Sequence, residues 1–357
     1  MKILFLACLN KNESGNTFGG AEKSIVKLTD WISKKRKEDR VILASVQGSE
    51  NTFLDDCQFE FYGTKQYKGK FVTHLMMLWN TWKIILSVRP NIVVSFWIHP
   101  LFYAIPLKMI LGFKMYHSIR NAPKQGYKRI TSILRECVLD KSDGIVFQTH
   151  DAMQEFPKYK DKSCVIFNPT YIKYDDYPLP KKRNNKVVNV GRLVPQKNQI
   201  LLIEAFNHIH REYPELILEI YGEGYLKEEL QNLINSLGAN EYIFLRGVTK
   251  NILDKIYGAR LFVLTSKYEG MPNALIEAMC VGTPVVSSDC PCGGPRELID
   301  DGVNGILFRE GNLDELIIAI KYALKKDEKI SLKAKKICDS NSEDEIFNKW
   351  VEFIMRV

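Results

Sequence analysis

Residues 261–279 have the sequence LFVLTSKYEGMPNALIEAM, in which a short apolar run is followed by a loop and a helix-forming segment. The run Leu261–Leu264 predicts a buried strand of a parallel sheet, and ligands of such sheets bind at the carboxyl edge of the strands. Pro272 suits the first turn of the following helix, where a missing N–H costs nothing. The amides around it, of Met271, Asn273 and Ala274, are then predicted to form an anion site.

Glu269 and Glu277 lie on either side of this predicted helix start. Glu277 is surrounded by apolar residues, and a carboxylate in such a place is costly unless strong hydrogen bonds satisfy it. Sugar hydroxyls would supply those bonds. The alternative is a purely structural role, with Glu269 at the helix start and Glu277 in an ion pair. Two glutamates with Gly270 and Pro272 between them favour the functional interpretation.

On both sides of this segment, short β-rich runs alternate with helical ones, which is typical of parallel α/β domains. Residues 169–185 contain three prolines and no periodicity, which predicts a linker. We therefore expect a first domain at 1–168, a linker at 169–185, a second domain at 186–340 and a final amphipathic segment at 341–357. The strands that we expect are Ile3–Cys8, Val41–Ser45, Ile92–Phe96, Gly144–Gln148, Cys164–Phe167, Val187–Val190, Leu216–Tyr221, Tyr242–Leu245, Leu261–Leu264 and Pro284–Ser287.

A second cluster, Val190–Asn198, also leaves a predicted strand and enters a predicted helix. Its Arg192 and Lys197 can reach over the same sheet edge, where Arg can fork onto two phosphate oxygens and Lys adds a point charge. Two cations on one loop match a diphosphate group. The alternative is a pair of solvated surface cations.

Glycines and histidines give weaker signals. Gly19 and Gly20, between the first strand and the first helix, allow a close approach of ligand or simply form a tight turn. The segment Gly222–Gly224 begins like a dinucleotide fingerprint, but a lysine occupies its third glycine position, which disfavours a dehydrogenase. His117 ends a strand-like run near Arg120 and Asn121, where a lone histidine is more often structural.

Composition restricts the class of protein further. The 357 residues are 45% hydrophobic and 26% charged, an ordinary globular balance, and no apolar stretch reaches the roughly 20 residues of a membrane span. Eight scattered cysteines, with only the weak C-x-C pair of Cys290 and Cys292, indicate a reduced, cytosolic protein rather than a zinc site. Residues 1–185 carry a net charge of about +12 and residues 186–357 about −4, which predicts an anionic partner for the first half.

Taken together, these clusters resemble the retaining glycosyltransferases of the GT-B fold, specifically glycosyltransferase family four. The resemblance covers nearly the whole chain and is densest between about residues 187 and 310. It implies two Rossmann-like parallel-sheet domains facing a central cleft, with the last helix crossing back to the first domain. The segments that carry it are Gly19–Glu22, Gly191-Arg192, Lys197-Asn198, Glu269–Pro272, Glu277–Met279, Gly282–Val286, Gly293–Glu297 and Asp301–Gly305.

The resemblance also implies roles for particular residues. Arg192 and Lys197 would hold the donor diphosphate, Glu277 the ribose hydroxyls and Glu269 the donor sugar, without a metal ion. Further donor-binding residues would be Gly20, Gly247, Val248, Gly270, Met271, Pro272 and Asn273. His117, Arg120 and Asn121 would lie on the sugar or acceptor side, and whether His117 or Arg120 contacts the transferred sugar is open.

The function that follows is transfer of a hexose or N-acetylhexosamine from a nucleotide diphosphate sugar, with UDP favoured, to a lipid-linked or surface-glycan hydroxyl with retention of configuration. The alternatives are a nucleotide-sugar epimerase of similar fold and a non-catalytic anion-binding module. Basic residues mixed with apolar ones predict peripheral binding of the first domain to the anionic inner face of the cell membrane. The alternative is that the apolar residues belong to the core and the cations are merely solvated. They include Lys34–Lys37, Lys108, Lys114, Arg120, Lys124, Lys128 and Arg129, near Leu101–Tyr103, Met109–Leu111, Phe113 and Tyr127. Nucleic acid is disfavoured because no recognised binding motif accompanies the charge.

Overall fold

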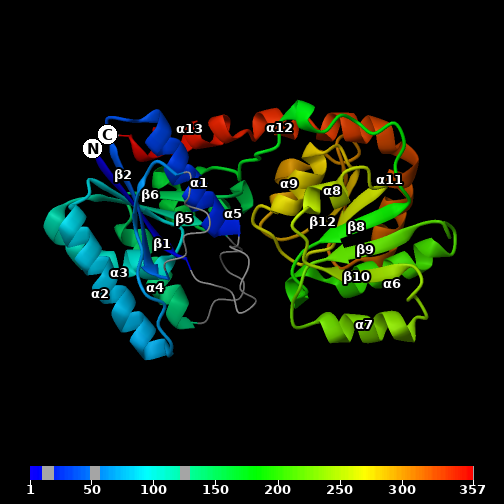
Figure 1. The fold of residues 1–357 in the computed structure, drawn as a ribbon, viewed down its shortest axis with the longest axis horizontal. Helices are drawn as coiled ribbons and strands as arrows, with labels where there is room; N and C mark the ends of the chain where they lie inside the picture. Colours follow the sequence, from blue (N-terminus) through cyan, green and yellow to red (C-terminus); the bar gives the residue numbers. More distant parts are fainter. Residues whose placement is uncertain (10–19, 49–56, 121–128, 357) are drawn as a thin grey trace. The chain divides into compact units, whose positions relative to one another are not determined.

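The alternating strand and helix segments build two separate parallel sheets, each in its own unit of the chain. The structure, a computed structural model, describes residues 1–9, 20–48, 57–120 and 129–356 (Figure 1). One unit consists of Met1–Asn168 and Ile346–Val357, and the other of Pro169–Glu345. The predicted linker is therefore part of the second unit, where the Arg183 guanidinium donates to Gly282 O at 2.8 Å and to Ser331 Oγ at 2.9 Å.

The sheet of the first unit has seven strands in the order β3-β2-β1-β4-β5-β6-β7, all parallel. Its inner strands β1, β4 and β6 are mostly apolar and buried because helices cover both faces of the sheet. In β1, Ile3 and Phe5 point into one core and Leu4 and Leu6 into the other. The elements are β1 Lys2–Cys8, α1 Gly20–Lys35, β2 Arg40–Gln47, β3 Glu60–Tyr62, α2 Lys70–Val88, β4 Ile92–Ser95, α3 Ile98–Leu111, β5 Lys114–Ile119, α4 Arg129–Lys141, β6 Gly144–Phe147, α5 His150–Gln154 and β7 Ser163–Val165.

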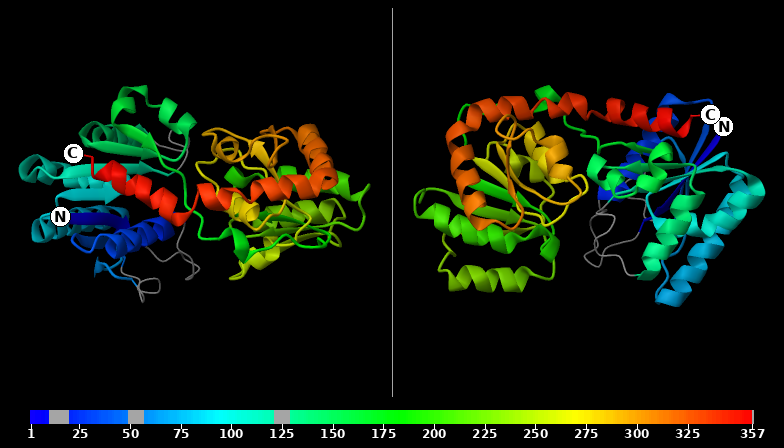
Figure 2. Two further views of the ribbon diagram at one scale, coloured as in Figure 1. Left: turned by 90° about the horizontal axis from the view of Figure 1, so that it is seen from above. Right: turned by 180° about the vertical axis from the view of Figure 1, so that it is seen from behind.

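The amphipathic segment at the end of the chain forms α13, Glu343–Ile354, which packs with α1 on one face of this first sheet (Figures 1 and 2). Its stripe of Ile346, Phe347, Trp350, Phe353 and Ile354 is buried in the same core as the helix α1. The ring centre of Trp350 lies 5.5 Å from that of Phe96, and the ring centre of Phe347 lies 5.9 Å from that of Trp31. The last helix therefore completes the core of the first unit.

The sheet of the second unit has six parallel strands in the order β10-β9-β8-β11-β12-β13. The strand order reverses between β8 and β11, and such a switch point leaves a crevice at the carboxyl edge. The elements are β8 Lys186–Val190, α6 Gln199–His210, β9 Ile217–Tyr221, α7 Lys227–Ser236, β10 Ile243–Gly247, α8 Ile252–Ile256, β11 Leu261–Leu264, α9 Asn273–Cys280, β12 Val285–Asp289, α10 Gly294–Leu298, β13 Ile306–Arg309, α11 Leu313–Ala334 and α12 Ile337–Ser340.

Candidate functional site

The loops after β8 and β11 meet at the switch point of the second unit through a buried ion pair. The Lys197 ammonium, from the loop before α6, bonds to Oε1 of Glu269, from the loop before α9. The hydroxyl of Ser266 donates to the same oxygen at 2.7 Å. Glu269 is only 6% exposed, and its second oxygen, Oε2, has no hydrogen-bond partner among the described residues. One carboxylate oxygen is thus fixed while the other is available.

Three hydrogen bonds to backbone carbonyls fix the two loops to each other. The amide of Lys267 donates to Gln196 O at 2.8 Å, and the Gln196 side chain donates back to Tyr268 O at 2.9 Å. Thr265 Oγ1 donates to Lys197 O at 3.1 Å. Because these bonds do not depend on a ligand, the ion pair is held in place in advance, as charge-stabilising sites require.

Arg192 lies on the same β8–α6 loop as Lys197. Its carbonyl accepts from Gln199 Nε2 at 3.0 Å, which fixes its backbone. Its side chain is exposed, and in the part of the chain that the structure describes the guanidinium has no ion-pair or hydrogen-bond partner. An arginine at a sheet's carboxyl edge that no carboxylate neutralises is suited to bind an anion.

The start of α9 differs by one residue from the sequence prediction. Pro272 precedes the helix as its N-cap instead of lying in its first turn, and Asn273 is the first helical residue. Gly270 and Met271 are buried in the loop before it, and Glu277 is half-buried one turn into the helix. The N-terminal end of α9 therefore lies at the carboxyl edge, beside the loop that carries Glu269.

Glycines allow the neighbouring loops to approach this site. A Cβ on Gly294 would lie 1.6 Å from Gly270 O, so only glycine permits the contact between the loops after β12 and β11. A Cβ on Gly222 would lie 2.0 Å from Gly191 O, which gives a packing reason for the partial dinucleotide fingerprint. The Gly222 amide donates to Gly247 O at 2.8 Å, and the adjacent Val248 is exposed.

The sequence did not single out two of these contributors, Ser266 and Gly294, as separate functional residues. Ser266 lies just after the predicted strand Leu261–Leu264, and its contact with Glu269 depends on the turn of the loop. Gly294 was part of a family motif, but its necessity comes from a backbone oxygen 24 positions earlier in the chain. Neither contact follows from spacing along the sequence.

The sequence suggested that His117 ends a strand. In the structure of the first unit, His117 instead lies inside β5, which continues to Ile119. The ring is buried, with Nδ1 3.2 Å from Ser95 O. Burial lowers the pKa of His117 to about 4, the positive charge of Arg135 acts in the same direction, and the bond to Ser95 opposes them. His117 is therefore a neutral imidazole near pH 7.

Two other residues expected on the first unit's side are described. The Arg120 guanidinium, directly after β5, lies 4.3 Å from the centre of the Phe96 ring, and Gly20 is the first residue of α1. Asn121 and Gly19 lie outside the described residues. The structure thus places Lys197 and Glu269 in contact, and it places His117 and Arg120 along β5 in the other unit.

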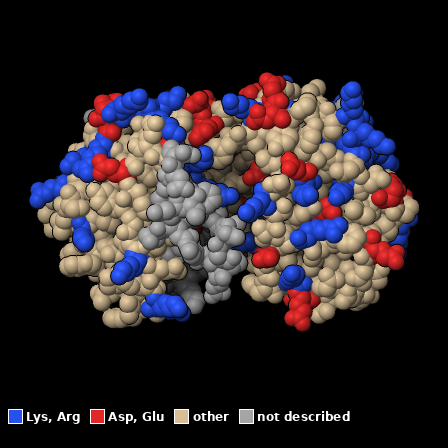
Figure 3. All heavy atoms as spheres, in the orientation of Figure 1, with Lys and Arg blue, Asp and Glu red and all other residues tan. Residues whose placement is uncertain are grey.

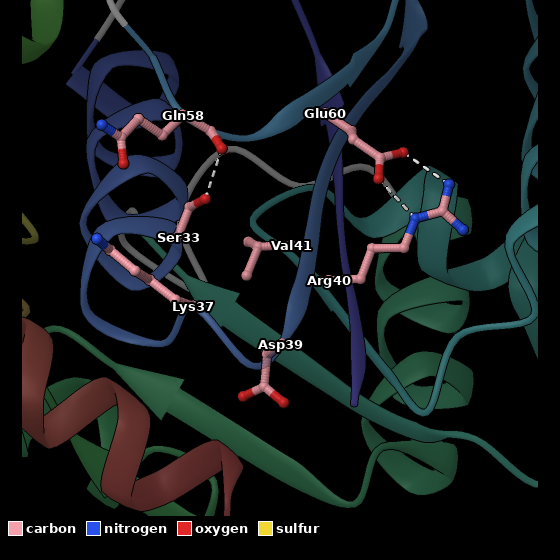
Figure 4. Close-up of a pocket in the computed structure, with 7 residues that line it drawn as sticks. All are labelled: Ser33, Lys37, Asp39, Arg40, Val41, Gln58 and Glu60. Carbon is pink, nitrogen blue, oxygen red and sulfur yellow. Dashed lines mark hydrogen bonds and ion pairs between the residues drawn. The ribbon is translucent and has the colours of Figure 1, made fainter.

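A separate pocket of about 390 Å³ lies in the first unit, at the start of β2 (Figure 4). The Arg40 guanidinium points at Glu60 and donates to both of its oxygens, at 2.6 and 2.7 Å. Because Arg40, Glu60 and Asp39 are already in ion pairs and the pocket lies away from the carboxyl edge of the sheet, this pocket is not the candidate site. It is lined by Ser33, Lys37, Asp39, Arg40, Val41, Gln58 and Glu60.

The described residues contain no group of three or more metal-ligating side chains positioned to hold a metal ion. All eight cysteines lie in described segments and are free thiols. Burial, and after it the charge of Glu269, raises the pKa of the Cys290 thiol to about 12, so it carries a proton near pH 7. None of the helices in the described part of the chain is both long and apolar enough to cross a bilayer.

Comparison with solved structures defines the class of fold. A crystal structure of an Anabaena protein, Alr3699/HepE, in complex with UDP and glucose superposes with a TM-score of 0.80, covering 99% of this chain and 98% of that one at 18% identity. The chain therefore has the GT-B fold, as the resemblance implied. The match extends over both sheets.

Comparison of sequences then gives the family. Residues 173–341 match the model described as Glycosyl transferases group 1, so the second unit belongs to this family. The chain is 31% identical over 248 residues to an uncharacterized glycosyltransferase of Methanocaldococcus jannaschii, covering 62% of this chain and 61% of that protein. It is 30% identical over 252 residues to the poly(glycerol-phosphate) alpha-glucosyltransferase of Bacillus subtilis, covering 68% of this chain and 36% of that protein. The chain thus spans less than two thirds of the length of either relative.

Proposed function

We propose that this protein transfers a hexose or N-acetylhexosamine from a UDP-sugar to a hydroxyl of a lipid-linked or surface-glycan acceptor, with retention of configuration and without a metal ion. The observation that carries the proposal is the preorganised Lys197–Glu269 pair beside the unpaired Arg192 at the switch point of the second unit. These residues supply two cations and an available carboxylate oxygen on one sheet edge.

The two cations act on the leaving group. As the bond between sugar and diphosphate breaks, negative charge develops on the phosphate oxygens, and fixed cations stabilise it most. The Arg192 guanidinium can bind two of these oxygens, and Lys197 has three donors, so it can bind phosphate while it stays bonded to Glu269. Because these two side chains would stabilise the charge of the diphosphate, we expect the reaction to need no divalent cation.

The remaining contacts hold the donor in position. Oε2 of Glu269 would accept bonds from hydroxyls of the sugar, and Glu277 from those of the ribose, while the loop of Gly270, Met271, Pro272 and Asn273 would contact phosphate. Gly247 and Val248 would contact the base. As the resemblance to family four implies, a hydroxyl of the acceptor would attack the sugar on the face that the diphosphate leaves, with the departing phosphate accepting its proton.

The first unit would contribute the other side of the site. Gly20 would approach the phosphates, and His117, with Arg120 and Asn121, would meet the sugar or the acceptor. As a neutral imidazole, His117 can donate or accept a hydrogen bond but adds no charge. Closure of the two units would exclude water from the reacting atoms.

The names of the similar proteins support the choice of substrates. The Anabaena structure holds UDP and glucose, and the Bacillus subtilis relative is named for poly(glycerol-phosphate), an anionic polymer. To reach an acceptor carried on a lipid, the protein would work on the inner face of the cell membrane as a peripheral protein. The excess positive charge of residues 1–185 supports that location.

A thermal-shift screen with UDP, other nucleoside diphosphates and their sugars tests the donor site, because a ligand of the folded state raises the melting temperature. With the donor found, NMR of the anomeric proton at early times is expected to show retention, and EDTA is expected to leave the rate unchanged. An inverted product or a strict need for a divalent ion contradicts the mechanism. Turnover without an acceptor favours an epimerase, and no response to any nucleotide favours an anion-binding module.

A further inference from the structure

The outer face of α2 is apolar where a surface helix is normally polar. The inner face is buried in the core through Met77, Ile84, Ile85 and Val88. Along the opposite face, Phe71, Leu75 and Trp79 are 80%, 53% and 64% exposed, and Trp82 and Leu86 continue the same stripe. Spacings of three and four residues place these side chains on one line along the helix.

The exposed face continues onto α3, which packs beside α2 (Figure 1). Trp82 Nε1 donates to Tyr103 O at 2.8 Å, and His74 Nδ1 lies 2.7 Å from the Tyr103 hydroxyl, so the two helices are tied together. At the end of α3, Met109 and Ile110 are also exposed. We call these residues, Phe71, Val72, Leu75, Trp79, Trp82, Leu86, Met109 and Ile110, the α2–α3 face.

This surface differs from the one that the sequence suggested. Leu101 and Phe113, expected on it, are buried in the core. The Lys34–Lys37 cluster ends α1, which covers the opposite face of the sheet from α2. Tyr127, Lys124 and Lys128 lie outside the described residues.

The stretch of sequence that contains the α2–α3 face carries an excess of positive charge, and Asp143 from outside this stretch pairs with Lys108 of α3 at 2.9 Å. Residues 61–135 contain no Asp or Glu, in a sequence that holds 42 of them elsewhere. In Figure 3 the surface over α2 is tan with scattered blue. Five cations at or near the two ends and the side of α2 are exposed and have no ion-pair partner among the described residues: Lys65, Lys68, Lys70, Lys83 and Arg89.

We propose that the α2–α3 face docks on an anionic phospholipid bilayer, with its aromatic and aliphatic side chains entering the headgroup region and the five cations contacting lipid phosphates. The inference rests on the proposed function, since it names the surface by which the enzyme reaches a membrane-borne acceptor. Tryptophan favours this interfacial depth, and unpaired lysines near it are attracted by anionic lipid. A second copy is a poor occupant, because a symmetric contact would bring the like-charged lysines around α2 of two copies together.

The docked orientation would present the acceptor edge of the first unit to the lipid. The helix α2 follows β3 and precedes β4 in a parallel sheet, so its Phe71 end lies at the carboxyl edge of the strands. His74, near that end, lies with its ring centre 4.9 Å from that of His99, which follows β4. A lipid-linked acceptor would thus arrive at the edge where ligands of α/β sheets bind.

Vesicle sedimentation with the full chain tests the inference. The variant Leu75→Gln/Trp79→Gln is compared with Ile318→Gln/Leu332→Gln on α11, whose side chains are similarly exposed at 65% and 51%. On vesicles of phosphatidylcholine with phosphatidylglycerol, the α2 variant should lose at least about tenfold in partitioning, and the α11 variant should match wild type. Lys68→Gln and Lys70→Gln should each cost about fivefold, and binding should weaken at high ionic strength.

Two further readouts separate this inference from the proposed function. The α2 variant should keep the wild-type melting temperature and its rise with UDP, whereas Arg192→Ala should lose the UDP response and still bind vesicles. Equal binding to phosphatidylcholine alone, or unchanged binding of the α2 variant, overturns the docking proposal. So does a dimer in light scattering that the α2 substitutions dissociate while vesicle binding persists. If neither wild type nor any variant shows a rise in melting temperature with UDP, the result would instead contradict the proposed function.

Discussion

Arg192→Ala should remove catalysis without disturbing the fold. The guanidinium has no partner among the described residues, so its loss breaks no interaction of the folded state, and surface substitutions of this kind change stability by at most about 0.5 kcal/mol. Removing one preorganised charge-stabilising group costs about 2–4 kcal/mol of transition-state stabilisation, which corresponds to a fall in kcat/KM of about 30- to 1,000-fold. The assay is release of UDP from the donor found by the thermal-shift screen.

Arg211→Ala is the matched control. Arg211 is also exposed and unpaired within the described residues, but it follows α6 at the opposite end of that helix from the site. The control should keep wild-type activity and wild-type response to UDP. If Arg192→Ala retains activity within twofold of Arg211→Ala, then Arg192 does not bind the leaving group and the assignment of the diphosphate site is wrong.

Two further predictions concern buried groups. Lys197→Ala should lower both activity and the free energy of unfolding, the latter by about 3 kcal/mol, because Glu269 would keep only the Ser266 hydroxyl as partner. Urea denaturation measures the change in the free energy of unfolding. The double variant Lys197→Ala/Glu269→Gln should recover part of the stability. No loss in the single variant contradicts the buried pair. His117 has a pKa of about 4 when folded, below the value of about 6.5 in an unfolded chain, so only the unfolded state gains its proton as pH falls between them. Wild type should therefore lose about 3 kcal/mol of stability from this residue between pH 7 and pH 4. Urea titrations at both pH values should show a smaller loss of stability for His117→Gln than for wild type. Equal losses in the two proteins would show that His117 is not buried as described.

The second unit was predictable from sequence because its signals are local. A buried strand such as Leu261–Leu264 is a continuous apolar run, and the residues that follow it must lie at the carboxyl edge of a parallel sheet. This rule alone predicts that Lys197 and Glu269 lie on the same edge of the sheet. The strand β13, by contrast, was missed although Asn304-Gly305 before it signals a turn, because Ile306–Arg309 has only four residues and ends in a charged one.

The apolar face of α2 could not be predicted in the same way. The helix has apolar residues all round, a pattern that ordinarily indicates a fully buried helix. Only the packing of α2 on one side of the sheet shows that half of these residues lie outside the core. The position of His117 within its strand was mispredicted for a related reason, because the end of a strand depends on the neighbouring strand. The strand β5 continues to Ile119 because β6 pairs with it up to that residue.

The helix α13 has a consequence for how the protein is made. The core of the first unit includes Trp350 and its neighbours, which are synthesised after every residue of the second unit. Domains generally fold as units, and those nearer the N-terminus usually fold first during synthesis. Here the second unit, one continuous stretch, can fold on the ribosome while the sheet of the first still lacks the helix that covers its Phe5 and Phe96 side. The part of the chain that is synthesised first is therefore completed last.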